Sequence, residues 1–157
     1  MLTAKIENAN TLNEFYSQIR SQQEDPKHHG AHYCAHHDMI QEFMIECTSY
    51  KELGTHQGAS AAAALLGGAK EVHLVDQTLE KYNWEKHLFK KYCKENDIAL
   101  NVYEMSSIDV KCAIPTDMLM IDSLHDWKWT IQELTLHAPI TKKYIILHRI
   151  PLTEKET

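Results

Sequence analysis

Short apolar segments alternate with segments of helical periodicity over residues 50–150. The expected strands cover residues 50–54, 71–76, 99–105, 117–122 and 142–150, and the expected helices between them cover residues 60–68, 79–95 and 129–138. Strands that alternate with helices are joined by right-handed crossovers, which place the strands parallel and put helices on both faces of the sheet. The sequence therefore predicts an α/β fold, a three-layer sandwich around a mostly parallel sheet of about five strands.

Two further helices are expected before the first strand. Residues 11–22 and residues 34–47 each carry apolar side chains at helical spacing, and a polar, histidine-rich connector joins them. A chain of 157 residues is expected to form a single domain. Its expected parts are an N-terminal helix with the histidine-rich connector (1–33), a core (34–150) and a tail (151–157).

Composition and charge limit the classes of partner. The formal charge of −6 disfavours a protein that binds nucleic acid through phosphate neutralisation. No apolar run approaches the ~20 residues that a membrane span needs, and the first residues lack the pattern of a secretory signal. Four widely spaced cysteines without a CxxC pair are typical of reduced thiols. We expect a cytoplasmic, intracellular protein with a small-molecule substrate and no membrane association.

The segment ELGTHQGAS, residues 52–60, joins the first expected strand to an alanine-rich helix. Gly54 permits a tight turn out of the strand, and Gly58 lets the backbone approach a ligand closely. Ser60 and the alanines then begin a helix whose free N–H groups face the same pocket. Because ligands of doubly wound sheets bind beside the first strand, the turn predicts a ligand site. The alternative is a tight loop that binds nothing.

Two acidic residues indicate the kind of ligand. Asp76 ends the second expected strand 22 residues after Gly54, near the ~20-residue offset of an acid that binds ribose hydroxyls. Glu52 is expected to point a carboxylate into the pocket, where it would repel a pyrophosphate. The turn also reads GxxxG, which differs from the GxGxxG of dinucleotide sites. A ligand with an adenosine part and a positive amino group is favoured, and S-adenosylmethionine (SAM) has both.

With these residues the chain resembles the class I SAM-dependent methyltransferases, whose first motif is an acid, a glycine turn and a helix. It looks closest to small methyltransferase-like proteins of phages and large viruses, through ELGTHQGAS and through DMLMIDSLHDWKWTIQELTLHAPITKKYIILHRI, residues 117–150. The resemblance implies a Rossmann-like sheet ordered 3-2-1-4-5, SAM as the cofactor, and methyl transfer to a small-molecule or sugar-like acceptor. It also implies the cytoplasm of a virus-infected host.

The same resemblance assigns roles to individual residues. Glu52, Gly54 and Gly58 would hold the methionine part of SAM, and Asp76 would hold the ribose. His125 would be the catalytic base beside the acceptor, and Asp122 would orient it. The full set of expected cofactor-binding residues is Glu52, Gly54, Thr55, His56, Gly58, Ser60, Asp76, Gln77, Ser106, Ser107 and Asp122.

Two departures from the family pattern leave other functions open. The family continues I-L-H-D where His148 is followed here by Arg149, and it normally has two strands beyond the fifth, so the chain is expected to be C-terminally short. The alternatives are a SAM-binding or interaction module without transfer activity, and an enzyme that cleaves SAM. Because an uncovered edge of strand five would promote aggregation, we expect a homo-oligomer that covers this edge.

Histidines also raise the question of a metal. Asp122, His125 and His148 together have the ligand types of a two-histidine, one-carboxylate site, but the adjacent Arg149 opposes a cation, so no metal is expected. Residues 28–37 hold five histidines without zinc-ligand spacing and are interpreted as a polar, pH-sensitive lid over the cofactor. As alternatives, Asp122 or Ser123 caps the following helix, and His125 packs against a tryptophan.

Overall fold

A computed structural model describes residues 3–25 and 31–148 of the chain. Its centre is one sheet of five parallel strands in the order β3-β2-β1-β4-β5. The strands are β1 (Ser49–Leu53), β2 (Glu71–Asp76), β3 (Ala99–Glu104), β4 (Thr116–Ile121) and β5 (Thr141–Leu147). The predicted fold class and strand order are both confirmed.

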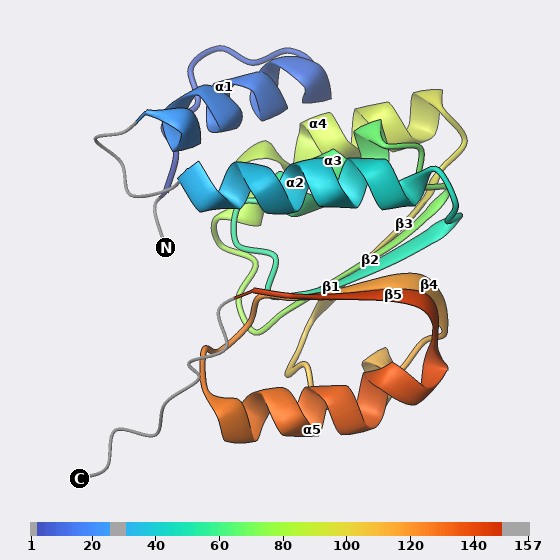
Figure 1. Ribbon diagram of the computed structural model, residues 1–157. Helices are drawn as coiled ribbons and strands as arrows, with labels where there is room; N and C mark the ends of the chain where they lie inside the picture. Colours follow the sequence, from blue (N-terminus) through green and yellow to red (C-terminus); the bar gives the residue numbers. More distant parts are fainter. Residues whose placement is uncertain (1–2, 26–30, 149–157) are drawn as a thin grey trace, which may run out of the picture.

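The helices are distributed unequally over the two faces of the sheet (Figure 1). One face is covered by α2 (Ala31–Met44), α3 (Ala59–Leu66) and α4 (Tyr82–Glu95), and α1 (Leu12–Glu24) lies outside them. The other face is covered by α5 (Trp127–His137), with the short 3-10 helices η1 (Val110–Cys112) and η2 (Ala138–Ile140) nearby. Among the described residues, no helix is both long enough and apolar enough to span a membrane.

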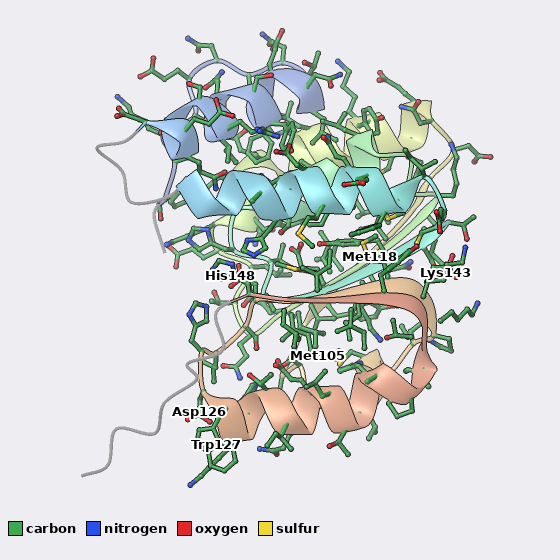
Figure 2. All side chains as sticks on the ribbon, in the orientation of Figure 1. Met105, Met118, Asp126, Trp127, Lys143 and His148 are labelled. Atoms are coloured by element: carbon green, nitrogen blue, oxygen red, sulfur yellow. The ribbon has the colours of Figure 1, made fainter. Side chains whose placement is uncertain are left out.

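Alternation along the strands divides the apolar interior into two clusters. Tyr50, Leu74 and Met118 belong to the larger cluster beneath α1 to α4. Leu53, three residues after Tyr50 in β1, and Val75, the residue after Leu74 in β2, belong to the smaller cluster against α5. Figure 2 shows the same division, with Met118 on the side of α2 and Met105 on the side of α5. Because successive residues of a strand face opposite sides, β4, which is buried on both faces, carries apolar residues at successive positions from Met118 to Ile121.

Helix α3 is short and almost entirely buried. Residues 61–64 are all alanine and have no exposed surface, so the helix lies close against the sheet and α2. Gly67 ends it, as the sequence predicted. The small side chains therefore bring the first turn of α3 near the end of β1.

Several helix boundaries differ from prediction by two or three residues; α4, for example, begins at Tyr82 instead of at residue 79. Helix α2 begins at Ala31, three residues before the predicted start, so the connector before it is shorter than expected. Helix α5 begins at Trp127 because the Asp126 side chain accepts a hydrogen bond from the Trp129 N–H (3.0 Å) and caps the helix. Neither Asp122 nor Ser123 is therefore the cap. Residues 28–30, Arg149 and the predicted tail lie outside the described residues.

Three glutamine side chains form hydrogen bonds with the backbone of the segment before α1. The Gln57 amide accepts from the Ala4 N–H (2.7 Å) and donates to the Ala4 carbonyl (2.9 Å). Gln22 makes the same pair of bonds with Lys5, and Gln18 makes it with Glu7. Because Gln57 belongs to the turn after β1, its pair of bonds holds the start of the chain next to that turn.

Candidate active site

The turn after β1 is pressed against the turn after β4. Gly54 has a positive φ of 92°, and its N–H donates to the Val75 carbonyl (2.8 Å). A Cβ at this position would lie 2.3 Å from the carbonyl oxygen of Asp122, far inside contact distance. Glycine is therefore required because of the neighbouring backbone, in addition to the turn that the sequence predicted.

Asp76 fixes the conformation of the same turn. Its Oδ2 accepts from the N–H groups of Thr55 (2.8 Å) and His56 (3.0 Å), and its Oδ1 accepts from the Thr78 N–H (3.2 Å). An ionised carboxylate offers about four lone-pair directions, so acceptor capacity is left for a ligand. Asp76 thus joins the end of β2 to the glycine turn at the place where a ribose was expected.

Two adjoining hollows open at the carboxyl ends of β1, β2 and β4, and both are lined by Gly54, Asp76 and Thr78. The smaller, of about 160 Å³, is also lined by Val75, Gln77, Ser107, Ser123, Leu124 and Trp129. The larger, of about 260 Å³, is also lined by His56, Glu80, Lys81 and Asp122. Strand order reverses between β1 and β4, and open α/β sheets bind ligands at this position.

The expected cofactor residues divide into two groups. Those that line a hollow are Gly54, His56, Asp76, Gln77, Ser107 and Asp122. Those that line neither hollow are Glu52, Thr55, Gly58, Ser60 and Ser106. Gly58 has a packing role that the sequence did not indicate. Its φ is 86°, and a Cβ there would lie 2.8 Å from Cζ of Phe89, so this glycine allows α3 to approach α4.

Glu52 lies on the face of β1 that is covered by α2, α3 and α4, and it is fully buried. The Tyr50 hydroxyl donates to its Oε2 (2.7 Å). Burial raises the pKa of Glu52 to about 8, while the hydrogen bonds from Ser60 and Tyr50 oppose that rise. The carboxyl group therefore faces Tyr50 instead of opening into the pocket as the sequence analysis expected.

Helix α5 contributes a buried polar network that sequence reasoning missed. Ser107 and Ser123 both donate to Oε1 of Glu133 (2.5 Å each), and the Trp129 indole N–H donates to the Ser107 hydroxyl (3.1 Å). Glu133 has no exposed surface, and burial raises its pKa. Trp129, Glu133 and His137 are spaced four residues apart, and this polar stripe within an amphipathic helix was the available signal.

A lysine enters the larger hollow from the start of α4. The Lys81 ammonium donates to Nε2 of His56 (2.9 Å) and to the Thr3 hydroxyl (2.8 Å). Desolvation, followed by the charge of Lys81, lowers the pKa of His56 to about 4. The imidazole is therefore neutral at pH 7, and Lys81 is the cation on this side of the hollow.

Histidines gather beside Asp122, beyond the ends of β4 and β5. Nε2 of His125 lies 3.1 Å from Oδ1 of Asp122, and Nε2 of His148 lies 4.0 Å from the same oxygen. His36 of α2 reaches the group, with its Nδ1 3.1 Å from Nδ1 of His148. Figure 2 shows His148 at the carboxyl end of β5, on the side of α2. The structure thus brings the two expected catalytic residues together and adds two histidines to them.

Several solved structures of methyltransferases share this architecture. No protein-family model and no curated sequence matches the chain. A methyltransferase from Podospora anserina with SAH bound has a TM-score of 0.59 and 13% identity, over 94% of this chain and 70% of that one. The chain has the fold of these methyltransferases.

Two further structures agree with this result. An O-methyltransferase from Bacillus cereus in complex with SAH has a TM-score of 0.53 and 14% identity, over 84% of this chain and 63% of that one. The N-methyltransferase NodS from Bradyrhizobium japonicum has a TM-score of 0.53 and 10% identity, over 75% and 65%. The chain spans less than two thirds of each of these two proteins.

Proposed function

We propose that the chain is a SAM-dependent methyltransferase for a small-molecule or sugar-like acceptor. The observation that carries the proposal is the pair of hollows meeting at Asp76, beside the glycine turn and at the point of strand-order reversal. The structural neighbours support it, because they are methyltransferases and two of them hold SAH, the demethylated product of SAM. These similarities support the fold, and the methyl-transfer activity is our inference from the site.

The lining of the hollows fits the parts of SAM. The apolar surfaces of Val75, Leu124 and Trp129 suit the adenine ring, with serine hydroxyls at its edge. Asp76 is placed between the hollows, where its remaining acceptor capacity suits the ribose hydroxyls. Lys81 in the larger hollow suits the carboxylate of the methionine part. The adenine ring, the ribose and the carboxylate thus each meet a group of matching polarity.

When bound, SAM supplies a methyl group on a positively charged sulfur that is reactive without further activation. The protein's contribution is then chiefly to hold the acceptor in line with the methyl group and to exclude water. Asp122 lines the larger hollow, and His125 next to it is 35% exposed at the side chain. In our proposal His125 accepts the proton of a hydroxyl acceptor, and Asp122 orients the imidazole.

A binding module without transfer activity is the second candidate. It is favoured by Glu52 and Gly58, two motif residues that serve internal packing and line neither hollow. Both candidates bind SAM, and they differ in the acceptor side of the site. A methyltransferase needs the Asp122–His125 pair, whereas a binding module does not.

Calorimetric titration with SAM and with SAH tests the shared part of the proposal. Asp76→Asn is the informative variant because it keeps one oxygen to accept from the turn while removing the charge. Asp97→Asn, at an exposed turn after α4, is the matched control. We expect micromolar binding to the native chain and to the control, and a loss of about tenfold or more, ~1.4 kcal/mol, in Asp76→Asn. Absence of heat with both ligands would overturn the proposal.

A further inference from the structure

The cluster beyond β4 and β5 has the composition of a metal site. The ligand atoms of Asp122, His125 and His148 all lie within 4.8 Å of one another. They come from two connections that are far apart in the sequence, one after β4 and one after β5. Two imidazoles and one carboxylate are the donor set that binds divalent transition metals with positions left open.

The separations match a first coordination shell after small adjustments. Nitrogen and oxygen ligands lie roughly 2.0–2.2 Å from such a metal, so two neighbouring ligands are about 3 Å apart. Asp122 Oδ1 is 3.1 Å from Nε2 of His125 and 4.0 Å from Nε2 of His148. The separations that involve His148 have to shorten, because His148 is 4.0 Å from Asp122 and the three ligand atoms span as much as 4.8 Å. A metal would take the place of the proton that His125 and Asp122 share.

His36 contacts His148 from outside the group of three candidate ligands. Its Nδ1 lies 3.1 Å from Nδ1 of His148, and the two rings meet edge to face at a centroid distance of 4.6 Å. This contact orients the buried His148 ring so that its other nitrogen, Nε2, faces Asp122. Metal-ligating histidines are commonly held in this way, by a partner on the nitrogen that does not bind the metal.

We propose that Asp122, His125 and His148 bind one divalent transition metal ion, such as Zn²⁺, Co²⁺ or Fe²⁺. Mg²⁺ and Ca²⁺ are disfavoured because they prefer oxygen ligands, and only one of the three residues supplies oxygen. This proposal revises the sequence-based expectation of no metal, which rested on the charge of Arg149. The three donors converge in the structure, whereas Arg149 lies outside the described residues.

The position of the site gives the metal a role. Asp122 also lines the larger hollow, so a metal ion that it holds would lie next to the space where an acceptor would bind. An oxygen atom of a small molecule in that hollow could complete the shell. This consequence rests on the proposed function and would make His125 a ligand in place of a base. Metal binding itself requires neither SAM nor an acceptor.

Titration of the chelator-treated protein with Co²⁺, followed by visible absorption, and with Zn²⁺, followed by calorimetry, tests the site. We expect one ion per chain. His125→Ala, which alters a partly exposed side chain, and Asp122→Asn should each weaken binding by about a hundredfold, and His36→Ala by about tenfold. His87→Ala, on the exposed side of α4, is the matched control and should leave affinity unchanged.

A second control addresses the histidine-rich segment before α2. The double variant His28→Ala, His29→Ala should retain the ion. The proposal is wrong if neither Co²⁺ nor Zn²⁺ binds to the native chain, or if binding survives in His125→Ala and is lost in the double variant. Titration with SAH in the absence of metal separates this result from the proposed function. Metal binding without SAH binding leaves the metal site standing, and SAH binding without metal binding removes only the metal site.

Discussion

Ionisable side chains are buried on both faces of the sheet next to the site. Glu52 is on the face of β1 that α2, α3 and α4 cover, and Lys51 is on the face that α5 covers. Neither side chain has exposed surface. The Lys51 ammonium donates to the Ile114 carbonyl (2.7 Å), and burial lowers its pKa to about 8. Groups of this kind titrate differently in the folded and unfolded chain, so they make folding stability depend on pH.

Glu52 yields a prediction with a definite sign. Its pKa is raised in the folded state from 4.5 to about 8, so the folded chain holds a proton that the unfolded chain releases. The stabilisation is complete below pH 4.5 and is lost as the pH rises to about 8. Relative to Glu52→Gln, the native chain should lose on the order of 2–4 kcal/mol of unfolding free energy across this range.

Urea denaturation of both proteins at a series of pH values measures this difference. Glu95→Gln removes one formal charge at an exposed position at the end of α4 and serves as the control. A constant difference between the native chain and Glu52→Gln from pH 4.5 to pH 8 would show that the pKa of Glu52 is the same in the folded and the unfolded chain, and would contradict the prediction.

Single residues also show what spacing can and cannot predict. Asp76 and Gly54 were expected at the site because a strand, a turn and a helix meet there, and both line the hollows. Their protein partners could not be predicted. Asp76 binds the N–H groups of the turn, and Gly54 is required by the carbonyl of Asp122, 68 residues later. Spacing identifies a required residue type, but the atom that imposes the requirement comes from the tertiary structure.

At the scale of elements, the site is formed by the turns after β1 and β4, which lie against each other. Gly54→Ala would place a Cβ 2.3 Å from the Asp122 carbonyl oxygen, and neither backbone can move without disturbing the β1–β4 pairing. Gly68 is the matched control, since its φ is also positive (106°) but no atom lies within 4 Å of a Cβ there. Gly54→Ala should therefore lower the unfolding free energy by about 2–3 kcal/mol more than Gly68→Ala.

Chemical denaturation of the two alanine variants is the measurement. Equal losses would mean that both residues matter only for backbone conformation and that the two turns are not tightly packed. A larger loss at Gly54 would show that the contact between the turns contributes to stability as well as to the shape of the hollows.

The elements themselves were predictable from periodicity, and their ends were less so. The sequence analysis proposed Asp122 or Ser123 as the cap of α5, and the structure shows that Asp126 is the cap instead. The hydrogen bonds from glutamine side chains to the backbone of the segment before α1 could not be predicted from periodicity. They join residues that are as many as 53 positions apart in the sequence.

At the scale of the whole molecule, β5 is an edge strand, with β4 as its only neighbour within the described sheet. Lys142 and Lys143 stand at its start, and lysines on an edge discourage uncontrolled pairing. Further along, Ile145 is 40% exposed. Ile145 is paired in register with Leu119 and so faces the α5 side of the sheet, where Leu124 and Ile131 are more than half exposed. The molecule thus carries an unpaired edge and exposed apolar side chains on the α5 side.

We predict that two copies of the chain associate through β5. A two-fold axis beside the edge would pair the strands antiparallel and bury Ile145 from both copies, which satisfies the backbone groups of both edges at once. Size-exclusion chromatography with light scattering should give a dimer for the native chain and a monomer for Ile145→Lys. Ile131→Lys places the same charge on α5 and should leave the dimer intact. A native monomer at high concentration would contradict the prediction, and a monomer in Ile131→Lys alone would place the interface on α5 instead of on β5.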